Sequence, residues 1–272
     1  NVIRGRPRGQ AMINRDKLYI DGSWTRSTGT DQIMVEDPKN GQIIGSVPDG
    51  TLADVDAAVS AARKSFSIWS ESSVEHRIEV LTNLSESFKA RSDTLAEVIT
   101  MEVGTPIEYS KIAMVGTPRV VAKSYAKLLD SYQWESQIRN SLIVKEPIGV
   151  CGFITPWNFP LHQIIGKVAP AIAAGCTMIL KPSREAPLNA FLLADMLHEI
   201  GLPNGVFNLV SGRGSSVGSR LSSHPGVDMI SFTGSTNAGV KVTEQAAESV
   251  KRVTLELGGK SANVILEDAD LS

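Results

Sequence analysis

The sequence predicts an α/β protein whose mostly parallel sheet is covered by helices on both faces. From Val150 onward, short apolar segments alternate with amphipathic segments, which is the pattern of repeated strand–helix units. Strands joined through helices run parallel, and burial on both faces makes them continuously apolar. Before this region the pattern differs, because hairpin signals and several helical segments come first. We therefore expect one sheet preceded by an N-terminal hairpin and helical section.

The first expected elements are two β-hairpins. Apolar residues flank the pair Asp21-Gly22 within Lys17–Trp24, and the pair Asn40-Gly41 follows Met34-Val35 and precedes Ile43-Ile44. Asp-Gly and Asn-Gly pairs fit the tight turns that join neighbouring antiparallel strands. Each pair therefore predicts a hairpin.

Helices are expected next. Thr51 and Asp54 have the spacing of a capping box, and apolar residues then recur at helical spacing as far as Trp69. Ser73 begins a second helix, and a third covers about 92–102 and ends before Gly104. One more continuous helix is expected over about 108–129.

The remaining elements follow from alternation of apolar and polar segments. Residues 132–145 interleave the two kinds of side chain, which indicates a strand pair with one wet face or a face that meets a partner. Further strands are expected at 152–154, 177–180, 206–210, 229–233 and 253–257, with helices at 163–174, 188–200, 216–222 and 238–249.

Composition excludes several classes of protein. The 272 residues carry 27 basic and 29 acidic side chains, so no electrostatic footprint for nucleic acid or an anionic membrane is present. No apolar window has the length of a membrane span. The four histidines are scattered without metal-like spacing, so no metal site is expected.

The two cysteines and the first eleven residues indicate the cellular compartment of the protein. Cys151 and Cys176 both lie in apolar runs, and we expect them to pack in the core rather than to form a disulfide, as in a reducing compartment. Residues 1–11 carry three arginines but no apolar segment follows, so they do not make a secretory signal. We expect them to be a disordered leader or residues added for expression, and the protein to be cytoplasmic.

A stiff loop follows the strand that begins at Val150. It reads Ile154-Thr155-Pro156-Trp157-Asn158-Phe159-Pro160, and its two prolines restrict the backbone. Rigid loops at strand ends are where α/β proteins place ligand-binding groups. The alternative is a Pro-rich connector in which Trp157 packs in the core and Asn158 caps the turn.

Three other strand ends carry polar groups. Lys181 follows a strand and is suited to ribose hydroxyls or a phosphate, although a lone lysine there is more often a solvated loop residue. Gly234 and Ser235 precede a helix whose N–H groups suit an anion, and the alternative is an ordinary N-cap. Glu256 lies in an apolar strand, where burial would raise its pKa toward that of a general base, unless an ion pair holds it.

Two glycine patterns resemble nucleotide motifs imperfectly. Gly212–Gly218 nearly matches the dinucleotide fingerprint, but its last glycine comes one residue late. Gly259-Lys260-Ser261 resembles the end of a P-loop, yet Thr254 occupies the place of the first glycine. Spacing alone therefore supports neither motif.

Taken together, four motifs resemble the N-terminal half of the aldehyde dehydrogenase superfamily. They are Pro156–Pro160, Lys181-Pro182-Ser183, Phe232–Thr236 with Gly239, and Leu255–Lys260, in the order and approximate spacing of that superfamily. The likeness runs from about Leu18 to the last residue. It implies a Rossmann-like domain that binds NAD or NADP, and an aldehyde substrate.

The resemblance also implies roles for individual residues. Asn158 corresponds to the residue that stabilises the oxyanion of a thiohemiacetal, and Glu256 to the general base that activates water to hydrolyse the thioester. The cofactor-binding positions implied in the same way are Ile154, Thr155, Pro156, Trp157, Lys181, Ser183, Arg184, Gly214, Gly218, Phe232, Gly234, Ser235, Gly239 and Leu257.

Two departures from the superfamily matter. Arg184 stands where a glutamate is frequent, which makes NADP plausible beside NAD, although Glu185 is able to substitute partly. The nucleophilic cysteine is expected beyond Ser272, since neither Cys151 nor Cys176 aligns with it. The 272 residues alone are therefore expected to be inactive.

The resemblance further implies an organisation and leaves alternatives. We expect residues 12–128 and 148–258 to form the dinucleotide-binding domain, 129–147 to be an oligomerisation hairpin of a homodimer or homotetramer, and 259–272 to begin a catalytic domain. The alternatives are a catalytically inactive nucleotide-binding or interaction module, and an acylating semialdehyde dehydrogenase. Retention of Glu256 favours the hydrolytic reaction.

Overall fold

The central sheet has seven strands in the order β12-β11-β8-β9-β10-β2-β3 in the computed structural model, which describes residues 12–270. The strands are β12 (Arg252–Leu257), β11 (Met229–Gly234), β8 (Val150–Ile154), β9 (Thr177–Lys181), β10 (Phe207–Leu209), β2 (Lys17–Ile20) and β3 (Ser23–Arg26). The first five run parallel, and β2 pairs antiparallel with β10. The predicted mostly parallel sheet is confirmed.

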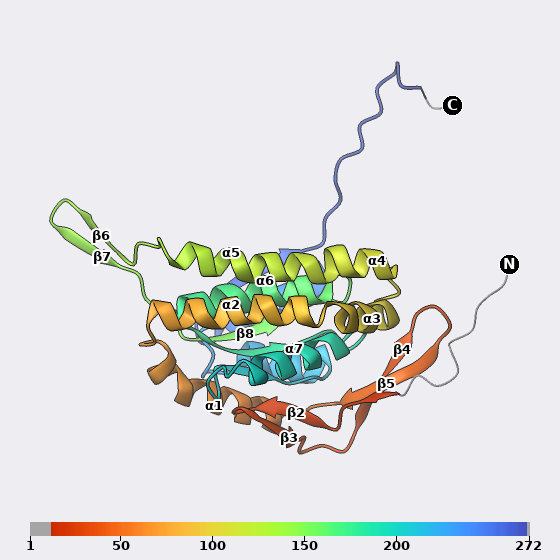
Figure 1. The fold of residues 1–272 in the computed structure, drawn as a ribbon, viewed down its shortest axis with the longest axis horizontal. Coiled ribbons are helices and arrows are strands. Elements are labelled where there is room, and N and C mark those ends of the chain that lie inside the picture. The colour runs from red at the N-terminus through yellow and green to blue at the C-terminus, as the bar shows by residue number, and fades with distance from the viewer. Residues whose placement is uncertain (1–11, 271–272) are drawn as a thin grey trace.

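Alternate residues of the strands face two different helical layers. Cys151 and Phe153 belong to a core with α2 (Val74–Ala90), α3 (Ser92–Val103), α5 (Gly116–Leu129), α6 (Pro160–Ala174) and α7 (Leu188–Glu199). Val150 and Ile154 belong to a second core with α1 (Leu52–Trp69), α8 (Ser219–Ser223) and α9 (Thr236–Ala247). Figure 1 shows α2, α5 and α6 stacked on one side of the sheet and α1 on the other. The two-residue period of a strand explains this division.

Both predicted N-terminal hairpins are present. Asp21 and Gly22 have φ of 51° and 74°, the left-handed conformation that a tight β2–β3 turn requires. The second hairpin pairs β4 (Gln32–Asp37) with β5 (Gln42–Pro48). A two-residue strand, β1 (Ile13–Asn14), adds to β5 in parallel and was too short to leave a sequence pattern.

The helix boundaries agree with the capping signals. Thr51 and Asp54 bond reciprocally at the start of α1, and Ser73 accepts from the His76 N–H at the start of α2. α3 ends at Gly104, whose φ is 83°. The single helix predicted at 108–129 instead consists of α4 (Ile107–Tyr109), the π-helical η1 (Ser110–Val115) and α5. Pro118 has no N–H to close the preceding turn, which accounts for the wider π-helical turn.

Residues 132–145 form the predicted strand pair, β6 (Glu135–Ile138) with β7 (Ser141–Val144). This hairpin projects away from the rest of the molecule (Figure 1). Its apolar side chains Ile138, Leu142 and Val144 are exposed. Leu142 and Val144 project from one face and Ile138 from the other, so both faces of the hairpin carry exposed apolar side chains.

Smaller differences concern element ends. α6 begins at Pro160 rather than at 163, and the helix predicted at 216–222 is divided into the π-helical η2 (Gly214–Gly218) and α8. Residues 258–270 contain no helix or strand. The prediction for residues 1–11 falls outside the described residues. Among residues 12–270, no helix combines the length and the hydropathy that crossing a membrane requires.

Candidate active site

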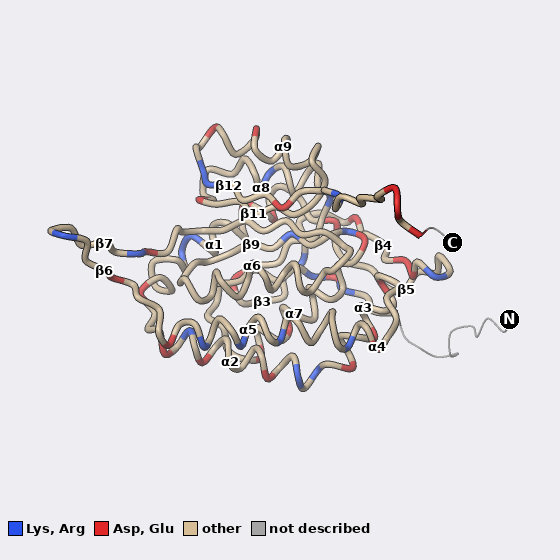
Figure 2. The backbone as a smooth tube through the Cα atoms, turned by 90° about the horizontal axis from the view of Figure 1, so that it is seen from above, with Lys and Arg blue, Asp and Glu red and all other residues tan. Residues whose placement is uncertain are grey.

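The predicted site residues gather where the parallel strands end. Ile154 of β8 pairs with Lys181 of β9 and with Phe232 of β11, and Thr233 pairs with Glu256 of β12. We call this end of β12, β11, β8 and β9 the carboxyl edge. Figure 2 shows β12 and β11 beside α8 and α9 at one end of the molecule. Ligands bind at this edge in α/β proteins.

A cleft of about 560 Å³ opens at the carboxyl edge on the side of α8 and α9. Five predicted cofactor residues line it, namely Ile154, Gly214, Gly218, Phe232 and Ser235. The first turn of α9 borders it as well, through Asn237 and Ala238. The structure therefore places these five residues around one space of nucleotide size.

The glycines near the cleft fall into two kinds. A Cβ on Gly214 would meet no atom within 4 Å, and one on Gly218 would lie 3.7 Å from the Lys181 Cδ atom, so side chains there would occupy open cleft space. A Cβ on Gly234 would lie 2.5 Å from the Phe232 ring, and one on Gly239 would lie 2.6 Å from a Leu257 methyl group. Close packing inside the protein explains the second pair.

Lys181 is buried, with 5% of its surface exposed. Its Nζ donates to the Pro182 carbonyl oxygen at 2.8 Å. Burial and the neighbouring Arg184 lower its pKa to about 8. The interpretation of Lys181 as a solvated loop lysine is therefore wrong, because the protein covers it, and Gly218 of η2 lies against its side chain.

Ser235 is an N-cap, as one of its two interpretations predicts, and it also lines the cleft. At the start of α9 its Oγ accepts from the Ala238 N–H at 3.3 Å. Two buried threonine hydroxyls at the carboxyl edge have no hydrogen-bond partner among the described residues, the Oγ1 atoms of Thr155 and Thr233. Buried hydroxyls normally have partners. Their presence at the carboxyl edge indicates a place for a polar ligand.

Trp157, Ser183 and Arg184 do not line this cleft. Trp157 is 52% exposed, so the alternative in which it packs in the core is wrong. It borders a separate hollow of about 490 Å³ together with Arg184 and Glu185, which form an ion pair at 3.1 Å. Ser183 accepts from the Glu185 N–H and holds this turn.

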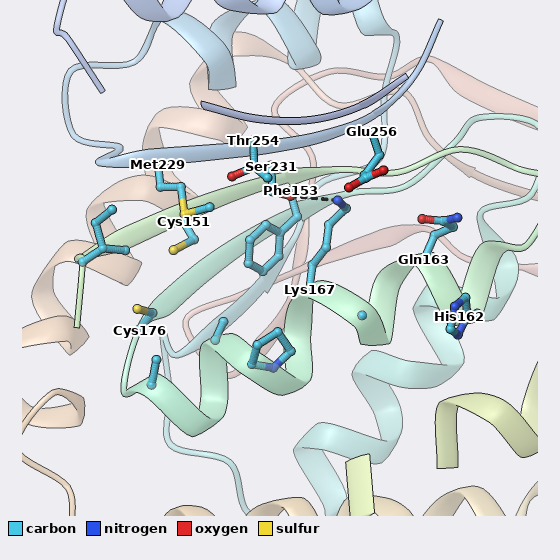
Figure 3. A pocket seen from close by; sticks show the side chains of 15 residues that line it. Cys151, Phe153, His162, Gln163, Lys167, Cys176, Met229, Ser231, Thr254 and Glu256 are labelled. Carbon is cyan, nitrogen blue, oxygen red and sulfur yellow. Dashed lines mark hydrogen bonds between the residues drawn. The ribbon is translucent and has the colours of Figure 1, made fainter. Parts of the chain in front are cut away.

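Glu256 is exposed, which corrects the expectation that an apolar strand would bury it. β12 is the last strand of the sheet, so one of its faces carries no helix within the described residues. Glu256 lines a cavity of about 430 Å³ between α6 and the sheet (Figure 3). Asn158, in the loop before α6, is exposed as well.

Lys167 is a candidate site residue that the motifs did not single out. It is the one charged residue of α6, and its Nζ donates to the Ser231 Oγ at 2.8 Å. Burial lowers its pKa to about 8, although the negative charge of Glu256 acts in the opposite direction. Figure 3 shows its ammonium group between Ser231 and Glu256. A lysine within the apolar stretch that follows Gln163 was the available signal.

Both cysteines are buried and free, as predicted, and lie far from this edge. Cys151 is the second residue of β8, and Cys176 precedes the first residue of β9. They therefore lie at the opposite, amino-terminal ends of the strands, which we call the amino edge. Neither thiol is placed to react with a group beside Asn158 and Glu256.

Comparison with known proteins gives one consistent result. The chain matches the profile of the aldehyde dehydrogenase family over residues 24–272. The 3-succinoylsemialdehyde-pyridine dehydrogenase of a Pseudomonas species is 49% identical over 263 residues, which are 96% of this chain and 55% of that protein.

Two solved structures extend the comparison to the fold. A mutant of aldehyde dehydrogenase C from Pseudomonas syringae, in complex with NAD+ and octanal, has a TM-score of 0.91 at 45% identity, over 97% of this chain and 54% of that chain. A betaine aldehyde dehydrogenase mutant from Staphylococcus aureus, in complex with NAD+, has a TM-score of 0.90 at 36% identity, over 94% of this chain and 53% of that chain. The chain thus spans about half the length of these relatives, and it belongs to the aldehyde dehydrogenase family.

Proposed function

We propose that the full-length protein oxidises an aldehyde to a carboxylic acid with NAD+ or NADP+. The observation that carries the proposal is that Asn158, Lys181, Ser235 and Glu256 lie at or just after the carboxyl ends of four neighbouring strands. Membership of the aldehyde dehydrogenase family supports the same reaction, as do relatives crystallised with NAD+.

The cleft beside α9 fits a dinucleotide. Gly214 and Gly218 keep it open, and the first turn of α9 offers N–H groups to a pyrophosphate. The buried ammonium of Lys181 and the unpartnered hydroxyl of Thr155 add polar groups that ribose hydroxyls would satisfy. When bound, the nicotinamide ring supplies the hydride acceptor.

Asn158 and Glu256 provide the acid–base and electrostatic functions of this half of the protein. Its amide lets Asn158 donate a hydrogen bond to the oxyanion that forms when a thiol adds to the aldehyde carbonyl. Glu256 takes a proton from the water that hydrolyses the thioester. We propose that the thiol comes from sequence beyond Ser272, because both cysteines of this chain lie at the amino edge.

Lys167 is a positioning residue for Glu256 in this proposal. Its ammonium is held by Ser231 and interacts with the Glu256 charge from within a cavity that both line. A pKa near 8 leaves Lys167 mostly protonated at neutral pH, so it presents a positive charge to the Glu256 carboxylate in that cavity.

Arg184 supports use of NADP+ as well as NAD+. Its ion-pair partner is the adjacent Glu185, and both side chains of that pair are more than half exposed. Such pairs contribute little free energy, so Arg184 is available to a 2′-phosphate. Melting temperatures with each nucleotide test this. Stabilisation by NADP+ should shrink in Arg184→Glu, and stabilisation of the wild type by NAD+ alone would contradict it.

The substrate and the assembly are also proposals. The Pseudomonas relative is named for a semialdehyde attached to a pyridine, and a semialdehyde is therefore the first substrate to test. We propose that the exposed apolar hairpin β6–β7 mediates a homodimer or homotetramer, with residues 12–128 and 148–258 as the dinucleotide-binding domain and 259–272 as the start of a catalytic domain. Free thiols favour a cytoplasmic location.

The decisive experiment uses the full-length natural product. Aldehyde-dependent formation of NADH or NADPH is expected, and Glu256→Gln should lower its steady rate by a factor of about 10²–10⁴ while nucleotide binding is retained. Glu244→Gln, an exposed position on α9, is the matched control. Nucleotide binding without aldehyde oxidation would instead establish an inactive module, and acyl transfer to coenzyme A would establish an acylating enzyme.

A further inference from the structure

The cavity between α6 and the sheet has two chemically different ends. Figure 3 shows His162, Gln163 and Glu256 at one end, and the sulfur atoms of Cys151 and Cys176 at the other. The polar end belongs to the candidate active site. The sulfur end lies at the amino edge, and the proposed reaction does not use it.

The two thiols face each other by virtue of the strand register. Cys151 pairs with Met178 across β8 and β9, so these two side chains project to the same face. Cys176 precedes Met178 by two residues and therefore projects to that face as well. Each cysteine has 3% of its surface exposed, and both line the cavity.

Hydrogen-bond donors and a cation surround the Cys176 sulfur. The Cys151 thiol and the backbone N–H groups of Gly149 and Ile148 favour its ionised form and so lower the pKa of Cys176. The positive charge of the Arg77 guanidinium also lowers the pKa of Cys176. This guanidinium packs against Gly175, where an added Cβ would lie 2.9 Å from its carbon. A cysteine that only fills core space would face apolar groups instead.

These surroundings distinguish the two thiols. The Cys151 thiol, the two N–H groups and Arg77 lower the pKa of Cys176 to about 7 in spite of its burial. The pKa of Cys151 is raised, first by its hydrogen bond to Cys176 and then by burial. The surroundings thus favour ionisation of Cys176 and retention of the proton by Cys151.

We propose that Cys176 and Cys151 form an oxidation-sensitive dithiol, in which a peroxide oxidises Cys176 and Cys151 then closes an intramolecular disulfide. In the first step the Cys176 sulfur attacks a peroxide oxygen. The S–O bond forms, the O–O bond breaks, and the leaving oxygen takes a proton, which yields a sulfenic acid and water or an alcohol. In the second step the Cys151 sulfur attacks the Cys176 sulfur, and the hydroxyl group leaves as water with the proton of Cys151.

The backbone allows the second step. Neighbouring strands lie about 4.8 Å apart and rise about 3.3 Å per residue, so Cα atoms two positions apart on parallel strands are about 8 Å apart, which is more than a disulfide spans. Cys176 lies before the first paired residue of β9. It belongs instead to the cap that ends α6, where its N–H donates to the Ala171 carbonyl. It is therefore able to move toward Cys151 without breaking a β8–β9 pair.

Oxidation of the 272-residue chain itself tests the proposal, because the chain has only these two cysteines. After hydrogen peroxide treatment of the native protein, intact mass and peptide mapping should show a chain lighter by two hydrogens, with Cys151 joined to Cys176. Cys151→Ser should instead accumulate a sulfenic acid at Cys176 that dimedone traps. Cys176→Ser should not react at the same peroxide concentration.

A comparison without mutation keeps the test decisive if a serine variant folds poorly. Cys176 in the native wild type should react roughly tenfold faster than in urea, because unfolding removes the donors that lower its pKa. The proposal is overturned if both thiols are inert until the chain unfolds, if Cys151 reacts as fast in Cys176→Ser, or if the product is a covalent dimer.

Discussion

The two ends of the parallel strands differ in whether their polar groups have hydrogen-bond partners. At the amino edge, polar groups have partners: Asp228 accepts from the Val150 N–H at 2.7 Å, and the Thr177 hydroxyl donates to the Ala62 carbonyl at 3.0 Å. At the carboxyl edge, the Thr155 and Thr233 hydroxyls have no partner within residues 12–270, and Lys181 is buried. Polar groups at the amino edge therefore stabilise the sheet, whereas those at the carboxyl edge are suited to hydrogen-bond a ligand.

A glycine at each edge gives the largest expected contrast. Gly149→Ala at the amino edge should lower the free energy of unfolding by about 3 kcal/mol or more, because its φ is 126° and the new Cβ would lie 1.9 Å from Asp228 Oδ2. Gly214→Ala at the carboxyl edge should change stability by less than about 1 kcal/mol and weaken nucleotide binding instead. Urea unfolding and nucleotide titration of both variants measure this. Equal destabilisation would remove the contrast.

The buried Glu102 makes stability depend on pH. It accepts hydrogen bonds from the Leu188 and Asn189 N–H groups at the start of α7, but burial raises its pKa to about 7. Because the folded state binds the proton more tightly than the unfolded state, this stabilisation is complete below about pH 4.5 and is lost as pH rises through about 7.

The expected loss between these limits is about 3 kcal/mol or less. Glu102→Gln cannot titrate there, so the wild type should lose free energy of unfolding relative to this variant between about pH 5 and pH 8. Denaturant curves at several pH values provide the measurement. Parallel pH profiles for the two proteins would show that Glu102 is not responsible.

Lys181 should separate stability from binding. Lys181→Met removes a buried ammonium whose pKa is lowered to about 8, so the variant without ligand should be more stable at pH 7 by about 1 kcal/mol. The same change should weaken nucleotide binding at least tenfold. Melting temperatures with and without nucleotide test both statements. A destabilised variant would mean that the Pro182 contact matters more than the cost of burial.

Two threonines give the smallest and most closely matched contrast. Thr177→Val at the amino edge removes a hydrogen bond to the Ala62 carbonyl and should cost about 1–2 kcal/mol. Thr155→Val at the carboxyl edge removes an unpartnered buried hydroxyl and should be neutral or stabilising by up to about 1 kcal/mol. Chemical denaturation of the two valine variants compares them. Similar losses at both positions would indicate that Thr155 has a partner after all.

The sequence predicted local features better than those set by distant parts of the chain. Asp21-Gly22 fixed the β2–β3 turn, and Thr51 with Asp54 fixed the start of α1, because each depends on a few adjacent residues. Glu256 was expected to be buried since its strand is apolar. Its exposure depends on β12 being the last strand of the sheet, which only the pairing order decides.

Burial at the candidate site was equally hard to foresee. Lys181 looks like a loop residue in sequence, yet Gly218, 37 positions later, allows the chain to cover it. The start of α6 was placed three residues late, because His162 and Gln163 interrupt its apolar pattern. The same two side chains mark the polar end of the cavity.

The pairing of β2 with β10 has a consequence for synthesis on the ribosome. Asp21, in the turn that follows β2, donates its N–H to the Asn208 side chain, 187 residues away. At a synthesis rate of about 5–20 residues per second, β10 leaves the ribosome roughly 10–40 s after the β2–β3 hairpin with which it pairs. During that interval the N-terminal hairpin has no sheet to join. Chaperones that bind nascent chains therefore have their longest opportunity at the first residues of this fold.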